Sequence, residues 1–120
     1  MKLIKLRCKD ALESPTPEQI EERFAGDKDF SNLYLEDMDF SGRDLSKSDF
    51  TNSDCRNASF NNADLRYAKF VNANLRGADL RAKDLAGSDF SNSDLTNTLV
   101  EDRFNLLWKA GKAKQARRYS

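Results

Sequence analysis

The sequence predicts an all-β solenoid over residues 28–100, and three observations lead to this prediction. A large apolar residue, nearly always Phe or Leu, recurs at every fifth position from residue 30 to residue 100, fifteen times without an insertion. The residue two positions before it is usually small, and the residue two positions after it is Asn or Gly in ten of the fifteen repeats. Short internal periods of this kind are typical of solenoids, in which each repeat contacts mainly its neighbours.

A period of five residues fits neither regular secondary structure. Five residues advance by about 140° around an α-helix, so the apolar positions would spiral around its axis. In a continuous strand, side chains alternate between two faces, so every second repeat would point the wrong way. The conflict disappears if the chain turns a corner after each short side, and Asn and Gly tolerate the backbone angles of corners. The large side chains then line one shared axis, with core columns Phe30, Phe50, Phe70 and Phe90, and Leu45, Leu65 and Leu85.

The number of sides in one coil is limited by two further patterns. Central residues fifteen positions apart are identical in two of twelve pairs, whereas those twenty apart are identical in seven of eleven. A coil of three sides is therefore excluded. Central residues ten positions apart match about as often, because Phe and Leu alternate, so the match at twenty does not prove a coil of four sides. Arg43 and Lys83 occupy small inward positions, where a buried charge would be costly. With four sides they lie at the two ends of one column, from which a charged group can reach solvent.

Several repeats resemble those of the pentapeptide-repeat family, whose consensus is roughly Ala-(Asp/Asn)-Leu-x-x. The matching runs are Ala63-Asp64-Leu65-Arg66-Tyr67, Ala73-Asn74-Leu75-Arg76-Gly77 and Ala78-Asp79-Leu80-Arg81-Ala82. The resemblance covers about 73 of the 120 residues. It implies a right-handed quadrilateral β-helix with four repeats per coil and about four coils.

The regions outside the repeats are expected to cap the solenoid. Residues 1–27 form the N-terminal cap, with an alternating segment at residues 2–8 that predicts a short strand. A helix follows, because Thr16 can act as its N-cap, Pro17 suits the first turn and Gln19 completes a capping box. Gly26 can end this helix. Residues 101–120 are expected to form a capping helix followed by a basic tail.

The C-terminal region carries two alternatives. Phe104, Leu107 and Trp108 form one apolar face of the expected helix, which we expect to cover the last coil. The alternative is a dimer contact, because the resemblance to the pentapeptide-repeat family implies that this terminus can join two chains end to end, as it does in related proteins. The chain is therefore expected to be a monomer or a C-terminal homodimer. The tail from Lys109 to Arg118 is expected to be solvated, with contact to nucleic acid or an acidic partner as the alternative.

Composition argues against most kinds of chemistry. Lys plus Arg equals Asp plus Glu at 20 each, so no net field attracts nucleic acid or an anionic membrane. No apolar run has the length of a membrane span. The chain has no His, its two cysteines lie far apart, and it has no Gly-rich phosphate loop. We therefore expect no catalytic residues, no metal and no cofactor, and the cysteines indicate reduced thiols in a cytoplasmic protein.

The remaining features favour a binding function. Arg56 and Arg76 are expected to lie one above the other on one side, and Tyr34 and Tyr67 are candidate exposed anchors. Asp44, Asp64 and Asp84 form an outward column that is interpreted as an ordinary surface feature. We expect a non-catalytic protein-binding or scaffold module whose partner the sequence does not identify. The alternative, which the resemblance implies, is a DNA mimic that inhibits or protects a DNA-handling enzyme such as gyrase.

Overall fold

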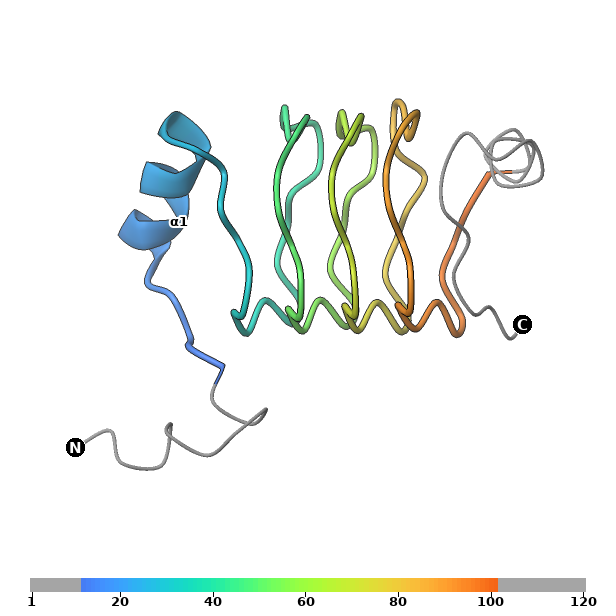
Figure 1. The fold of residues 1–120 in the computed structure, drawn as a ribbon, viewed down its shortest axis with the longest axis horizontal. Coiled ribbons are helices and arrows are strands. Elements are labelled where there is room, and N and C mark those ends of the chain that lie inside the picture. The colour runs from blue at the N-terminus through green and yellow to red at the C-terminus, as the bar shows by residue number, and fades with distance from the viewer. Residues whose placement is uncertain (1–11, 102–120) are drawn as a thin grey trace.

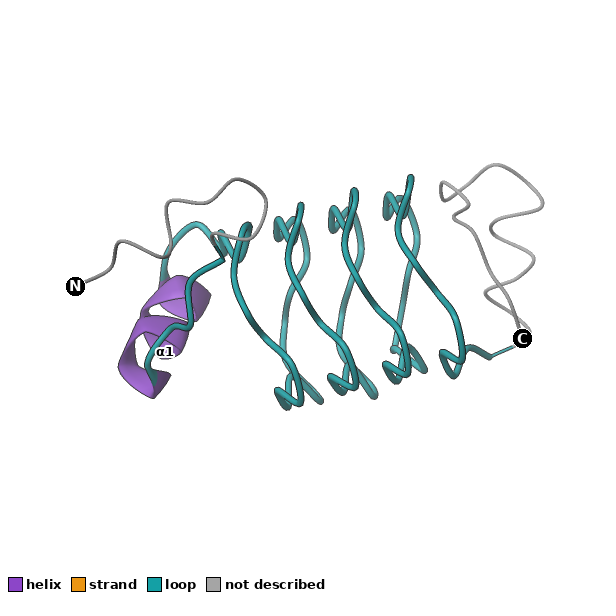
Figure 2. Ribbon diagram, turned by 90° about the horizontal axis from the view of Figure 1, so that it is seen from below, coloured by secondary structure: helices purple, strands orange, loops and turns teal. Residues whose placement is uncertain are grey.

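The computed structural model describes residues 12–101. A short extended approach leads into helix α1 (Pro17–Ala25), and a continuous solenoid follows it (Figure 1). Within residues 12–101, twelve isolated parallel β-bridges join residues twenty positions apart. One joins Glu13 of the approach to Leu33, and the others hold successive coils together, as between Asp44 and Asp64. One coil therefore contains four five-residue sides, and the fold is of the β-helix type. Each side forms a single bridge instead of a long strand, so the coils appear as loops in Figure 2.

The corners between sides share one backbone geometry. At a typical corner, the N–H of Ser53 donates to the carbonyl of Phe50 at 3.1 Å, and Asn52 between them has a φ of 63°. A positive φ at the third residue is what a type II turn requires, and Gly and Asn adopt it most readily. Thirteen of the fourteen corners between residues 30 and 98 have this positive φ. The Asn and Gly pattern of the sequence therefore marks the corners.

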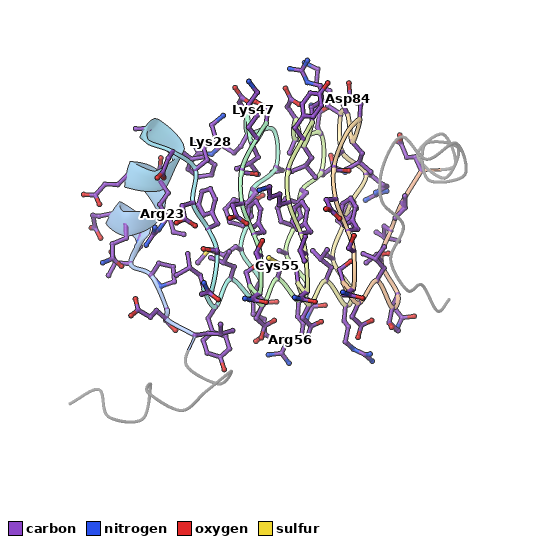
Figure 3. All side chains as sticks on the ribbon, viewed as in Figure 1. Arg23, Lys28, Lys47, Cys55, Arg56 and Asp84 are labelled. Carbon is purple, nitrogen blue, oxygen red and sulfur yellow. The ribbon has the colours of Figure 1, made fainter. Side chains whose placement is uncertain are left out.

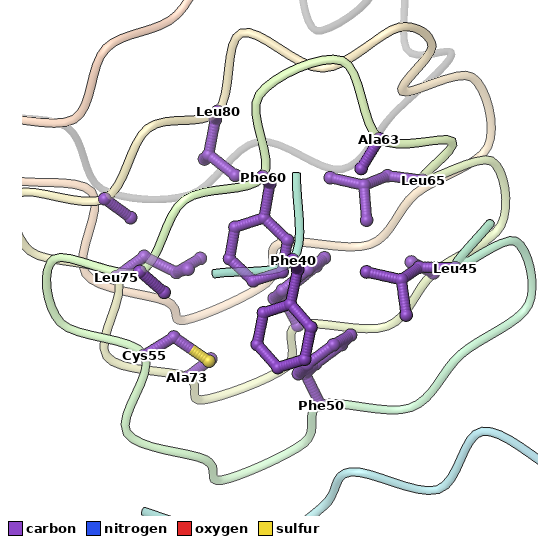
Figure 4. Packing of buried hydrophobic residues seen from close by; sticks show 14 of the residues in the cluster. Phe40, Leu45, Phe50, Cys55, Phe60, Ala63, Leu65, Ala73, Leu75 and Leu80 are labelled. Carbon is purple, nitrogen blue, oxygen red and sulfur yellow. The ribbon is translucent and has the colours of Figure 1, made fainter. Parts of the chain in front are cut away.

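The core is a set of columns along the axis. The rings of Phe30, Phe50, Phe70 and Phe90 are fully buried and stack with centroids 4.7–4.9 Å apart. Phe40 and Phe60 stack on the opposite side of the coil, and their rings meet the first column edge-on. Leu45, Leu65 and Leu85 are fully buried on a third side, and the fourth side is filled by leucines and Cys55. Figure 4 shows Leu45, Leu65 and Cys55 beside the rings.

Serine is tolerated inside the solenoid because its hydroxyl is paired. Ser48, Ser53, Ser88 and Ser93 are buried at inward positions that alanine occupies in other repeats. Each hydroxyl donates to the carbonyl three residues earlier, at 2.6–2.7 Å. A buried hydroxyl without a partner would destabilise the fold by roughly 1–3 kcal/mol. The hydroxyl and the backbone N–H of each serine donate to the same carbonyl, so the side chain adds a second hydrogen bond across the corner.

Helix α1 begins as the sequence predicts. The Thr16 hydroxyl accepts from the Gln19 N–H at 3.1 Å, and the Gln19 side chain accepts from the Thr16 N–H at 2.9 Å, which completes the capping box. At the other end, the N–H of Gly26 donates to the carbonyls of Arg23 and Glu22. The helix covers the first coil, where the ring of Phe24 lies 5.3 Å from Phe30 and 5.9 Å from Phe40.

The two charged residues at inward positions avoid the core in different ways. The guanidinium of Arg43 leaves through the open end, lies 3.9 Å from the ring centroid of Phe24 and pairs with Glu21. Lys83 is exposed because the backbone shifts at its corner and Ala82 takes the inward place, 2% exposed. The N–H of Lys83 then donates to the carbonyl of Ala63 at 2.8 Å in the preceding coil. Leu33 and Met38 are large for inward positions of the first coil; Leu33 is buried in the core, and Met38 is partly buried and packs against it.

Some predictions lie outside the described residues. These are the strand at residues 2–8, the C-terminal helix with Phe104, Leu107 and Trp108, and the basic tail. No helix within residues 12–101 is long and apolar enough to cross a membrane.

Candidate functional site

One side of the solenoid brings together an exposed tyrosine and two arginines. Its inward residues are Leu35, Cys55, Leu75 and Leu95, and we call its outer surface the Tyr34 face. Its bridges connect Tyr34, Asp54, Asn74 and Asp94 in sequence, so the coils are in register along the whole face. Figure 3 shows Arg56 on the outside of this side and Cys55 within the solenoid. The outward residues of the Tyr34 face are Tyr34, Glu36, Asp54, Arg56, Asn74, Arg76, Asp94 and Thr96.

Arg56 is held by carboxylates of two coils. Its Nε donates to Asp54 Oδ1 at 2.9 Å and its Nη2 to Asp54 Oδ2 at 2.8 Å, which makes a bidentate pair. The same Nη2 lies 3.3 Å from Glu36 Oε1 in the preceding coil. Asp54 is almost buried, at 8% exposed, whereas the Arg56 side chain is 40% exposed. The hydrogen bonds that Arg56 donates to Asp54 raise the pKa of Arg56, so this guanidinium stays charged.

Arg76 lies one coil further along and is oriented the other way. Its Nη1 donates to Asp94 Oδ2 in the following coil at 3.2 Å, and its backbone N–H donates to Asn74 Oδ1 at 3.2 Å. Asn replaces the usual Asp at position 74, so Arg76 has no carboxylate within its own repeat. Its side chain is 53% exposed. Arg56 therefore pairs toward the N-terminal end and Arg76 toward the C-terminal end.

The pairing leaves donors available on the Tyr34 face. Within residues 12–101, Arg56 Nη1 and both Nε and Nη2 of Arg76 make no hydrogen bond. Tyr34 is 40% exposed and lies one coil before Arg56 and two coils before Arg76. The Tyr34 face thus offers oriented N–H groups and part of an aromatic ring on a rigid, regular support. Such groups suit the carboxylates and apolar atoms of a protein surface.

The recurring Asp of the repeat has a structural role that its spacing did not reveal. Asp directly precedes the central apolar residue in ten of the fifteen repeats. Each of these ten aspartates accepts a hydrogen bond from the backbone N–H two residues later, at 2.9–3.2 Å. Where the later residue is Ser, Thr or Arg, its side chain adds a further bond, as Arg81 does to Asp79. These carboxylates hold the start of each corner in place, as side chains do in Asx-turns.

The outward column of Asp44, Asp64 and Asp84 lies on a different side from the arginines. Asp64 pairs with Arg66 at 2.7 Å, whereas Asp44 accepts from Ser46 and lies 3.4 Å from Lys28. The hydrogen bonds from Ser46 lower the pKa of Asp44 to about 2. The column is anionic, but part of its charge is neutralised by these neighbours. Tyr67, the second predicted anchor, lies near this side and is 60% exposed.

Reactive chemistry has little support in the described part of the chain. No three His, Cys, Asp or Glu residues between 12 and 101 are grouped so that they could hold a metal ion. Cys55 is fully buried, and burial raises the pKa of its thiol to about 12. A thiol that stays protonated is a poor nucleophile. The other predicted contact residues, Phe104, Leu107 and Trp108, lie outside the described residues.

A search among curated proteins finds no match. Among solved structures, the chain is similar to a pentapeptide repeat protein from the thylakoid lumen of Arabidopsis thaliana, with 28% identity and a TM-score of 0.41. That match covers 67% of this chain and 60% of the Arabidopsis protein. A pentapeptide repeat protein from Nostoc PCC 7120 is also 28% identical, with a TM-score of 0.31, and the match covers 89% of this chain and 98% of that one.

The family profile described as pentapeptide repeats, in eight copies, matches residues 29–66, 44–81 and 73–98. The matched stretches cover more than half of the chain, and this repeat implies a right-handed β-helix type of fold. The twenty-residue spacing of the bridges agrees with four such repeats in each coil. The chain belongs to the pentapeptide repeat family.

Proposed function

We propose that this chain is a non-catalytic protein-binding module that presents the Tyr34 face to a protein partner carrying carboxylates. One observation carries the proposal: Arg56 and Arg76 lie on one side of adjacent coils, and both retain unused N–H donors. Guanidinium groups bind carboxylates through paired hydrogen bonds, which adds geometric specificity to charge. The hydrogen-bonded coils keep this side rigid, so little conformational entropy is lost on binding.

A pull-down from a lysate of the source organism tests the proposal. The test variant is Arg56→Gln with Arg76→Gln, and the matched control is Arg66→Gln with Arg81→Gln. Both doubles remove two charges, but the control arginines lie on the other sides and pair with Asp64 and Asp79. We expect a carboxylate-bearing partner to be retained by the control and lost by the test variant. Equal retention by both variants would exclude the Tyr34 face as the binding surface.

The alternative is a DNA mimic that inhibits or protects a DNA-handling enzyme such as gyrase. One observation favours it: residues 12–101 hold eighteen anions and ten cations, although the whole chain is neutral. The outward column of Asp44, Asp64 and Asp84 adds regular negative charge to one side. A gyrase supercoiling assay with added protein separates the two functions. Inhibition or protection would support the mimic, and no effect at micromolar concentration would exclude it.

A further inference from the structure

The N-terminal end of the solenoid is only partly covered. From the second coil onward, the residue before the central one donates its N–H to the preceding coil, as Asp54 does to Leu33 and Ser59 does to Met38; the exception is the repeat of Leu85, where Lys83 donates instead. The first coil has no preceding coil, so its N–H groups need other partners. Tyr34 donates to the carbonyl of Glu13 at 2.7 Å, which places the approach segment on this side as an added rung.

The N–H groups on the other three sides of the first coil differ in whether they have a partner. The N–H of Asp29 donates to the Asp27 carboxylate at 3.2 Å, so its side is satisfied locally. The N–H groups of Asp39 and Asp44 have no hydrogen-bond partner in the part of the chain that the structure describes. Asp39 and its neighbours therefore present an open strand edge, which readily pairs with another extended segment.

An apolar cleft lies directly beside Asp39. It is formed between α1 and the first coil and has a volume of about 320 Å³. Ile20 and Phe24 line it from the helix, and Met38 and Phe40 line it from the coil. Arg43 crosses over Phe24 to pair with Glu21, and all three of these residues belong to the lining. An open edge next to an apolar cleft is the arrangement that binds a strand with alternating side chains.

We propose that residues 2–8 of this chain pair with the open edge at residues 38–40 and place Ile4, Leu6 and Cys8 in the cleft. Alternate residues of a strand share one face, and these three form the apolar face of the segment. The opposite face carries Leu3, Lys5 and Arg7, and Lys2 at the start of the segment shares the face of Ile4. Pairing would satisfy the N–H of Asp39 and shield the apolar lining, and it would complete the cap that Glu13 begins.

Charge and tether length favour this segment as the occupant. Residues 1–9 carry four cations and no anion, whereas residues 13–39 carry nine anions and two cations. Leu12 directly precedes Glu13, which pairs with Leu33 at this end of the solenoid, so the segment begins close to its site. Residues 9–11 join the segment to Leu12, and the four extended steps from Cys8 to Leu12 reach about 14 Å, close to the length of one five-residue side. Attachment to the same chain also gives the segment a high effective concentration.

Amide hydrogen exchange in the full chain, followed by NMR, tests the proposal. We expect the N–H of Asp39 to exchange slowly and the N–H of Asp44, which the segment does not cover, to exchange rapidly. Leu6→Asp puts a charge on the apolar face, so it should speed the exchange of Asp39 by at least about tenfold. Leu3→Asp makes the same change on the opposite face and should leave Asp39 protected. The amides of Phe50 and Phe70 report that the solenoid remains folded in each variant.

Three results would overturn the proposal. The first is an Asp39 amide that exchanges at the unprotected rate in the unaltered chain. The second is equal acceleration by the Leu3 and Leu6 variants, because the face of the segment would then not matter. The third is protection that disappears on dilution, which would mean that a second copy of the chain pairs with this edge.

Discussion

The rings of Phe50 and Phe70 are parallel to within 3°, and their centroids lie 4.7 Å apart. This distance is close to the roughly 4.8 Å between neighbouring hydrogen-bonded strands, so the backbone ladder sets the spacing of the rings. Phe60 on the opposite side meets both rings edge-on, at 5.5 and 5.4 Å. Stacked and edge-on contacts are both favourable for aromatic rings. Phe therefore recurs at ten-residue spacing because opposite sides of one coil meet across the axis.

Phe70→Ala should destabilise the solenoid strongly. Phe70 is fully buried and contacts Phe50, Phe60 and Phe90, so the truncation leaves a cavity in the middle of the core. We expect the free energy of unfolding in urea to fall by about 3–5 kcal/mol. Val71→Ala, one residue later and facing outward, should change it by about 0.5 kcal/mol or less. A larger loss for Val71 than for Phe70 would contradict the assignment of inward positions.

The stability of the fold should decrease in acid because of its hydrogen-bonded aspartates. Ser46 lowers the pKa of Asp44 to about 2, and hydrogen bonds also lower the pKa values of Asp39, Asp64 and Asp79. An unfolded Asp titrates near 3.9, so these carboxylates stabilise the folded chain above about pH 4. Their contribution is lost as the pH falls from about 4 toward 2. We expect Tm to be nearly constant between about pH 7 and 5 and to fall below about pH 4.

Asp44→Asn identifies one contributor to the acid sensitivity. The variant should start with a lower Tm at neutral pH and lose less of it on acidification, because it cannot be protonated. Asp37→Asn is a suitable control, since the Asp37 side chain makes no hydrogen bond within residues 12–101. Its Tm should fall with pH as steeply as that of the unaltered chain. An identical acid profile for Asp44→Asn would show that Ser46 and Lys28 do not hold the charged form of Asp44.

The sequence predicted the period, the inward positions and the corners because each is repeated many times. It also predicted the start of α1, where Thr16 and Gln19 form the capping box. These features depend on local backbone preferences and on which side chains avoid water. Both can be read from residue type and spacing alone.

The corner at Ala82 and Lys83 could not be predicted, because a strict period assumes that every inward position stays inward. A buried lysine would cost several kcal/mol, whereas one turn hydrogen bond contributes about 1 kcal/mol. The chain therefore gives up the bond from Lys83 N–H to Leu80 and turns Ala82 inward. The opposite orientations of Arg56 and Arg76 could not be predicted either, because they depend on side-chain rotamers and on the carboxylates of the neighbouring coils.

Gly87→Ala should be destabilising for two separable reasons. Gly87 has a φ of +75°, and an added Cβ would lie 2.5 Å from Cδ1 and Cε1 of the Tyr67 ring. We expect a loss of about 1–2 kcal/mol in the free energy of unfolding. In a Tyr67→Asn background only the backbone strain remains, so the loss should be about 1 kcal/mol. Equal losses in the two backgrounds would show that the ring moves aside without cost.

Cys55 should react with iodoacetamide only when the solenoid opens. Its side chain is fully buried, lies 3.3 Å from Ser53 Oγ, and has a pKa raised to about 12 by burial. The thiolate is the reactive form, so both access and ionisation wait for unfolding. Mass spectrometry of the peptide containing Cys55 follows the reaction, and Tyr67→Cys provides an exposed thiol that should react at once.

The alkylation rate of Cys55 should therefore follow global stability. If reclosing is faster than alkylation, the rate depends on the equilibrium population of the open chain. Phe70→Ala, which we expect to cost about 3–5 kcal/mol, should then speed the reaction by about two to four orders of magnitude. Val71→Ala should leave the rate almost unchanged. Rapid alkylation in the unaltered chain, or a rate that ignores Phe70, would mean that the column of Leu35, Cys55, Leu75 and Leu95 opens independently of the stacked rings.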